Sequence, residues 1–181
     1  MTEPYTELQM AFTKSADEAD DYRAQCRSVV LDLSKDLADY LHLPSPAEIK
    51  FVDAEVLDES ADKGVIEVPQ QHNDPFDAGE LVDGGWYRIG LCFGIAEVGK
   101  IEPAWYPIIP LRLKLNSKSN EFTLQIENPK QEFELGQSPK VNARRVSEWI
   151  VQHLVKSAQT IFTNYLSGNS RRVMGFNAGL S

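Results

Sequence analysis

The stretch that decides the fold is WYRIGLCFGIAE, residues 86–97. One alternating face carries bulky apolar side chains from Tyr87 to Ile95, and the other carries Trp86 followed by mostly small residues. A period of two is typical of a β-strand. Gly90 and Gly94 lie on the second face, where glycine marks a bend or the close approach of another segment. We therefore predict the clearest strand of a sheet here.

A hairpin is predicted next, from strands at 104–115 and 120–127 around the turn-forming residues 116–119. We expect a register in which paired residue numbers sum to 235. It places Leu113 opposite Phe122 on the core face and Lys114 opposite Glu121 outside, and opposite charges across a strand pair are mildly favourable. A one-residue slip would turn the apolar face outward.

Shorter strands are predicted at 49–57, at 64–68 and around Phe133 and Leu135. Residues 69–85 show no period and contain proline, glycine and four acids, so we expect a long loop there.

A long helix precedes these strands. Ser15 and Glu18 have the spacing of a capping box, so the helix is predicted to begin at Ser15. Pro44 and Pro46 end it. Its apolar positions fall in an arc of about 120°, the width of a helix that packs on one side. They are Tyr22, Cys26, Val29, Val30, Leu33, Leu37, Tyr40 and Leu41.

A second helix is predicted from Asn142, a good cap residue, to Ser167, with Gly168 as its terminator. Its apolar positions span well over 180° of the circumference. We therefore expect a mostly buried helix, either enclosed by a curved sheet or shared with a second subunit.

These elements predict an α+β fold, with a curved, mainly antiparallel sheet of about six strands between two long helices (order α-β6-α). The expected organisation is a flexible N-terminal arm at 1–14, a single α+β domain at 15–168 and a C-terminal tail at 169–181. The tail carries Arg171 and Arg172 followed by apolar residues.

The composition is 42% hydrophobic and 25% charged, as in an ordinary globular protein. No apolar run approaches the roughly 18 residues of a membrane-spanning helix, and the first residues lack the pattern of a secretory signal. Cys26 and Cys92 lie far apart and match no metal-binding or redox spacing, so two reduced core thiols are expected. We therefore predict a cytoplasmic protein without a membrane partner.

Charge is spread unevenly along the chain. Residues 1–83 contain 20 Asp and Glu against 6 Lys and Arg, whereas residues 84–181 contain 7 against 12. A net charge of −9 argues against direct nucleic-acid binding, which needs a basic face. Either the two halves neutralise each other within one fold, or an acidic surface attracts a basic partner.

Chemical motifs are weak. Residues 94–100 match the GxxxxGK pattern of a phosphate-binding loop, but Ile101 replaces the magnesium ligand and Pro103 prevents the helix that should follow. A hairpin turn at Gly99 explains these residues better. His153 is expected to be a core histidine, and His42 to lie at a helix C-terminus. We assign no catalytic residue, metal site or cofactor.

Two clusters are the candidate binding sites. The first is the acidic loop with Asp74, Asp77, Glu80 and Asp83, which we expect to contact a partner protein. An apolar ligand pocket under the second helix is the other, and its lining would be Trp86, Cys92, Trp105, Trp149 and Phe162.

The favoured hypothesis is a non-catalytic binding or regulatory protein that acts on another protein through an acidic surface, with a homodimer as one expectation. Its partner would be basic, DNA-binding proteins included. Enzymatic activity is undecided, although the missing motifs favour a non-enzyme. One alternative is a metal-assisted hydrolase that uses His72, Asp74, Asp77 and Asp83. The other is a carrier of a small apolar ligand.

Overall fold

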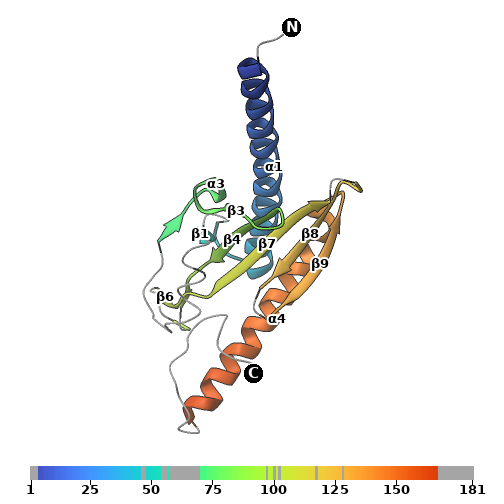
Figure 1. Cartoon of the computed structure of the whole chain (residues 1–181). Coiled ribbons are helices and arrows are strands. Elements are labelled where there is room, and N and C mark those ends of the chain that lie inside the picture. Colours follow the sequence, from blue (N-terminus) through green and yellow to red (C-terminus); the bar gives the residue numbers. More distant parts are fainter. Residues whose placement is uncertain are drawn as a thin grey trace.

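The computed structural model describes residues 4–45, 48–53, 57, 70–96, 98–99, 101, 103–116, 118–127 and 129–166, with the backbone alone at 104, 141 and 160–166. A long N-terminal helix, a mostly antiparallel sheet that does not close, and a C-terminal helix follow one another along the chain (Figure 1). The predicted α+β fold class is therefore confirmed. The predicted strand 64–68 and tail 169–181 lie outside the described residues.

The first helix, α1, spans Pro4–Leu41. The start predicted at Ser15 is wrong, because no glycine or internal proline interrupts residues 5–41 and Pro4 is tolerated in the first turn. At the other end the Leu43 amide donates to the Ala38 carbonyl, and the His42 amide donates to the Asp39 carbonyl. His42 takes a left-handed φ of 54°. This pattern is a Schellman motif, and it ends the helix before Pro44.

The main sheet has seven strands among the described residues, and all of its strand pairs are antiparallel. Six neighbours follow the order β2 (Gln71–His72), β1 (Lys50–Val52), β4 (Trp86–Cys92), β7 (Ile108–Asn116), β8 (Glu121–Ile126) and β9 (Gln131–Gly136). The seventh strand, β3 (Glu80–Val82), pairs with the first half of β4, and β1 pairs with its second half. The strongest predicted strand is thus bordered by three others.

The predicted loop 69–85 is wrong in part. Besides β2 and β3 it contains one helical turn, α3, at Pro75–Ala78. These elements are too short to show a period of their own, and pairing with β1 and β4 stabilises the two strands.

A small second sheet pairs β5 (Ile95–Ala96) with β6 (Pro103–Trp105). Gly99 between them has a φ of 83°, which confirms the turn predicted there. At Gly94, a Cβ would lie 2.6 Å from Pro103 Cγ, and at Gly90 one would lie 2.9 Å from Leu57 Cδ2. Both glycines therefore permit the close approach of another segment, as expected.

The β7–β8 hairpin forms, but the predicted register is wrong by two residues. Leu113 lies opposite Leu124 and Leu111 opposite Ile126, so paired numbers sum to 237. The turn explains the shift: Asn116 Oδ1 accepts from the Lys118 amide, and Asn120 adopts a left-handed φ of 54°. The loop therefore lies at 117–120 instead of the predicted 116–119, and Asn116 pairs with Glu121 as the last residue of β7. A two-residue shift keeps the same side chains on the core face.

The last helix, α4, spans Pro139–Leu166. Its start at Asn142 was wrongly predicted, because Pro139 already suits the first helical turn. The side-chain Nδ2 of Asn142 instead donates to the Leu135 carbonyl over 2.9 Å. The predicted end, with Ser167 and Gly168, lies outside the described residues.

Burial of α4 is one-sided over residues 142–159, so the predicted burial around most of its circumference is wrong there. Val155 is 50% exposed. The buried positions are Ala143, Val146, Ser147, Ile150, His153, Leu154 and Ser157.

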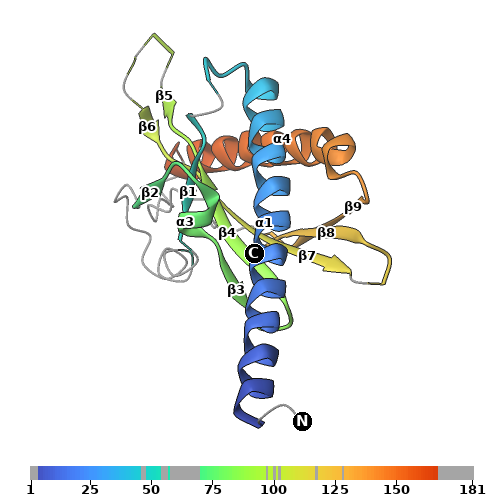
Figure 2. The same ribbon diagram turned by 90° about the horizontal axis from the view of Figure 1, so that it is seen from above.

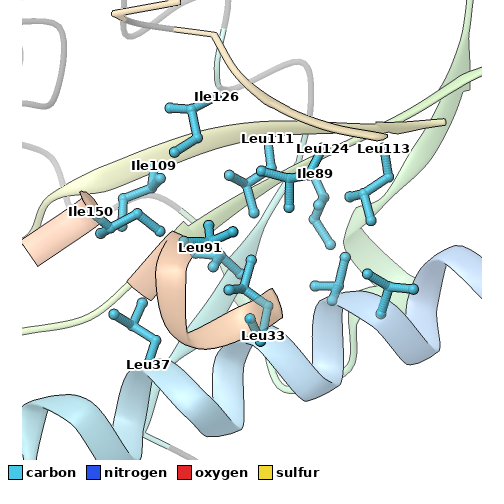
Figure 3. Close-up of a cluster of buried hydrophobic side chains, with 14 of the residues drawn as sticks. Leu33, Leu37, Ile89, Leu91, Ile109, Leu111, Leu113, Leu124, Ile126 and Ile150 are labelled. Carbon is cyan, nitrogen blue, oxygen red and sulfur yellow. The ribbon is translucent and has the colours of Figure 1, made fainter. Parts of the chain in front are cut away.

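Both helices lie on the same face of the sheet and cross each other (Figure 2). In the core, Leu33 and Leu37 of α1 and Ile150 of α4 meet the apolar side chains of β4, β7 and β8 (Figure 3). The predicted apolar stripe of α1 supplies this contact, with Cys26, Val30 and Leu37 fully buried. The N-terminal part of α1 extends beyond the sheet (Figure 1). No described helix has the length and apolar character needed to cross a bilayer.

Candidate functional site

The predicted acidic site begins at Asp74, whose role is structural. Asp74 has extended backbone angles and caps α3, because its Oδ1 accepts from the Phe76 amide over 2.9 Å. Its second oxygen, Oδ2, forms an ion pair with Arg27 of α1. The Tyr87 hydroxyl donates to the Pro75 carbonyl over 2.7 Å and ties the same turn to the sheet. Asp74 therefore joins α3 to α1, and its side chain is 40% exposed.

Gly79 follows α3 and leaves room for this anchor. A Cβ at Gly79 would lie 1.9 Å from the Tyr87 hydroxyl oxygen, so any side chain there would displace the tyrosine. Burial raises the pKa of Tyr87 well above its ordinary value, which keeps the hydroxyl protonated and able to donate. The chain thus holds α3 in one position.

The other three predicted partner-binding residues remain on the surface. Asp77, Glu80 and Asp83 are exposed and form no ion pair with the described part of the chain. Phe76 is 56% exposed, and the Arg27 guanidinium carbon lies 5.8 Å from the centre of its ring. We call Phe76, Asp77, Glu80 and Asp83 the acidic surface. It combines an exposed aromatic ring with three carboxylates.

The turn that contains Asp83 is fixed to α1. Tyr22 donates its hydroxyl to the Gly85 carbonyl over 2.6 Å and accepts from the Leu115 amide over 3.3 Å. These two bonds hold the turn that contains Asp83 against α1. Burial raises the pKa of Tyr22 to about 12. The exposed acids Asp17, Glu18, Asp20 and Asp21 lie in the turn of α1 just before Tyr22.

The residues of the hydrolase alternative are not brought together. His72 Nε2 lies 3.1 Å from Asp53 Oδ2, and Asp74 is engaged by Arg27. In the described part of the chain, no group of three or more histidine, cysteine, aspartate or glutamate side chains could hold a metal ion. The geometry gives a metal-assisted hydrolase at His72, Asp74, Asp77 and Asp83 no support.

The predicted apolar pocket does not assemble as expected. Trp86 and Cys92 lie on the sheet face opposite the core, because Tyr87, Ile89 and Leu91 alternate with them and point toward the helices. Trp149 lies on α4, on the other side of the sheet. Trp105 packs against the core from β6, and the side chain of Phe162 lies outside the described residues. The prediction of one pocket lined by all five is therefore wrong.

Trp149 and Trp86 have local packing partners instead. The Trp149 ring stacks on His153 with centroids 5.1 Å apart and meets Phe133 edge-on at 5.9 Å. His153 is buried, as expected for a core histidine. Burial is the main cause of its lowered pKa, and the charge of the nearby Lys156 lowers the pKa further. Lys114 lies 5.7 Å from the centre of the Trp86 ring. Burial raises the pKa of the Cys92 thiol to about 12.

Sequence reasoning missed a charge cluster on the face of the sheet opposite the helices. Arg88 of β4 lies directly opposite Arg112 of β7, and two like charges in register repel. Glu127 resolves this conflict, because its two oxygens accept from the Nε atoms of Arg88 and Arg112. The cluster joins the end of β8 to β4 and stabilises the sheet. Predicting this cluster from the sequence would have required the register of β4 against β7, which places Arg88 opposite Arg112.

Sequence reasoning also missed the exposed half of α1. Tyr5 is 69% exposed, Leu8 66% and Phe12 76%. At 100° per residue they fall on the same side of the helix as the buried Cys26, Val30 and Leu37. The sequence does contain a signal for this continuous stripe, because apolar residues recur every seven positions. They are Tyr5, Phe12, Ala19, Cys26 and Leu33.

Charge remains segregated in the ion pairs that join described residues. Described ion pairs of the acidic N-terminal portion stay within residues 1–83, as in Lys14–Glu18, Arg23–Asp20 and Arg27–Asp74. Those of the remainder stay within residues 84–181, as in Arg88–Glu127 and Arg144–Glu148. No ion pair between described residues links the two portions.

Comparison with known proteins gave no match: no family model, curated protein or solved structure is similar to the chain.

Proposed function

We propose that this chain is a non-catalytic cytoplasmic protein that binds a basic protein partner through the acidic surface of Phe76, Asp77, Glu80 and Asp83. The surface lies on α3, β3 and the turn after β3, which Asp74, Tyr87 and Tyr22 fix to α1 and the sheet. A preformed surface loses little conformational entropy on binding, which favours recognition of a partner.

The segregated charge carries this proposal. Ion pairs between described residues do not cross from the acidic portion to the basic portion of the chain. The described basic side chains of residues 84–181 therefore do not neutralise the carboxylates of Asp77, Glu80 and Asp83. Clustered charge of one sign raises the association rate with a partner of opposite charge. A DNA-binding protein offers such a basic face, and we include it among the expected partners.

Phe76 supplies the apolar part of the contact. Aromatic residues are enriched among interface residues that dominate binding energy, and a ring surrounded by charged residues is typical of such a site. Arg27 beneath the ring limits its motion. A cytoplasmic location is supported by the two thiols, which are both free and buried.

Photo-crosslinking in cells of the native host tests the proposal. Benzoylphenylalanine at Phe76 replaces one aromatic side chain by another on the surface itself. We expect it to capture a basic protein, whereas the same group at Glu134, an exposed acid on β9, should not. Capture at neither position, or equally at both, would contradict the proposal.

Charge reversal then tests the electrostatic part. Asp77→Lys with Asp83→Lys should reduce binding of the captured partner by at least about tenfold, because reversing charges in an interface changes both attraction and repulsion. Glu132→Lys with Glu134→Lys makes the same change of net charge on β9 and serves as the matched control. Equal effects of the two pairs would mean that net charge, rather than the acidic surface, determines binding.

A further inference from the structure

We propose that the part of α1 that extends beyond the sheet, residues 4–21, pairs antiparallel with the same segment of a second copy of this chain. The contact would be the apolar stripe formed by Tyr5, Leu8, Phe12, Ala16 and Ala19. This site is separate from the acidic surface, so the inference does not depend on the proposed function.

Continuity with the core is the first reason. The stripe falls on the side of α1 that packs on the sheet further along, through Cys26, Val30 and Leu37. The N-terminal part of α1 extends beyond the sheet (Figures 1 and 2), and Tyr5, Leu8 and Phe12 are exposed there. A contiguous exposed apolar patch that includes two large aromatic rings marks an interaction site on a soluble protein.

The size pattern of the stripe is self-complementary in one direction only. In an antiparallel pair whose residue numbers sum to 24, Tyr5 faces Ala19, Leu8 faces Ala16, and Phe12 meets its own counterpart on the two-fold axis. Tyr5 and Leu8 then lie opposite alanines, and only the two Phe12 rings meet each other, which allows close packing of the two helices. A parallel pair would place large against large at one end and leave a gap between alanines at the other.

Charge also favours a second copy in this direction. On the helical wheel, the uncharged Gln9 and Ser15 lie about 60° from the centre of the stripe and Asp20 about 80° from it, whereas Glu7, Lys14 and Glu18 lie about 120° or more away. Two acidic chains can therefore approach without like charges meeting in the seam. Asp20 would lie beside the N-terminal end of the partner helix, whose backbone dipole favours a negative charge. A parallel pair would bring the acids at 17–21 of both copies together.

The free length of α1 fits this arrangement. Tyr22 is the residue whose hydroxyl first reaches the sheet, through Gly85 and Leu115. A sum of 24 places the partner's first helical residue, Pro4, opposite position 20. Each helix would thus cover the other's free stripe and stop just before the sheet.

The area is sufficient for a reversible dimer. Each aromatic ring can bury about 150–250 Å². Four rings and two leucines, each about two-thirds exposed or more, would give roughly 1,000 Å² with their flanking atoms, which is the lower range of specific interfaces.

Sedimentation velocity with the full chain, from low micromolar to sub-millimolar concentration, tests self-association. We expect a monomer–dimer equilibrium that Phe12→Ser weakens by at least about tenfold, because removal of a central aromatic anchor costs most of its contact energy. Met10→Ser is the matched control, since Met10 is 54% exposed but lies on the opposite side of the helix. A monomer at all concentrations, or equal effects of the two variants, would overturn the inference.

Disulfide trapping tests the direction. Phe12→Cys should form a disulfide with its own counterpart, and Leu8→Cys should form one only when mixed with Ala16→Cys. The native thiols will not compete, because burial raises the pKa values of Cys26 and Cys92 to about 12. Efficient self-trapping of Leu8→Cys would show a parallel pair and contradict the antiparallel arrangement. Crosslinking from Phe76 reports on the acidic surface separately, so the failure of one proposal leaves the other standing.

Discussion

Several polar residues that stand out in the sequence serve the fold at the scale of single side chains. Asp74 satisfies a helix terminus and pairs with Arg27, and His153 fills space beside the Trp149 ring. Glu127, which belongs to no motif in the sequence, accepts hydrogen bonds from two arginines that face each other. Side-chain type alone does not distinguish these roles, because each depends on which neighbour lies within about 3 Å of the polar atom.

His153 makes stability depend on pH. Burial lowers its pKa in the folded state, so the unfolded chain binds a proton more readily between that lowered value and the ordinary value of 6.5. We therefore expect the free energy of unfolding contributed by this group to be fully present above pH about 6.5 and to fall as the pH decreases below it. Urea unfolding of the wild type and His153→Gln at several pH values should show a shallower pH dependence for the variant. His42→Gln changes an exposed histidine and is the control.

The elements show how short segments depend on their neighbours. α3 is a single turn that could not persist alone, because forming one helical turn fixes several residues for very few hydrogen bonds. The Asp74 cap, the Arg27 ion pair and the Tyr87 hydrogen bond hold it in place. The acidic surface inherits its rigidity from these three contacts.

Two substitutions of Asp74 separate its contributions to α3. Asp74→Asn keeps a capping oxygen but removes the ion pair, which is about 40% exposed, so we expect a cost of about 0.5 kcal/mol. Asp74→Ala removes both and should cost about 1–2 kcal/mol. Urea unfolding measures both values. Equal losses would mean that the ion pair, rather than the cap, stabilises this turn.

The whole molecule has two separate surfaces in these proposals. The apolar stripe of α1 joins two copies, and the acidic surface of each copy remains available to a basic protein. Such an assembly would bind a partner with two sites, and two linked contacts hold a multivalent or symmetric partner more tightly than one.

Hydrogen exchange should detect this organisation directly. Amides of residues 5–19 lie in a part of α1 that extends beyond the sheet and would gain further protection through pairing, so their exchange should slow as the protein concentration increases. Amides around Leu33 and Leu37, which are buried under the sheet, should not depend on concentration. Mass spectrometry of peptides from both regions provides the measurement, and uniform behaviour of the two regions would contradict the predicted dimer.

The sequence by itself determined the fold class, the buried stripe of α1, the turn at Gly99 and the main part of the strands at 86–97 and 104–127. These features depend on local periodicity and on backbone angles, which neighbouring residues specify. The predicted strands 86–97 and 104–115 are each divided, because β5 and β6 form a separate small sheet beside β4 and β7. The start of α1 and the hairpin register were predicted wrongly, because capping signals recur inside helices and a two-residue slip leaves the apolar face unchanged. Asp77, Glu80 and Asp83, which the sequence marks as an acidic loop, are exposed in the structure.

Only the tertiary structure decided which residues meet across the sheet and which apolar residues remain uncovered. The pairing of Arg88 with Glu127, the separation of Trp86 from Trp149 and the structural role of Asp74 depend on contacts between distant segments. The same holds for α1, whose stripe has the same apolar character along its length. The sheet is too short to cover the stripe before Tyr22, and the exposed surface begins where that coverage ends.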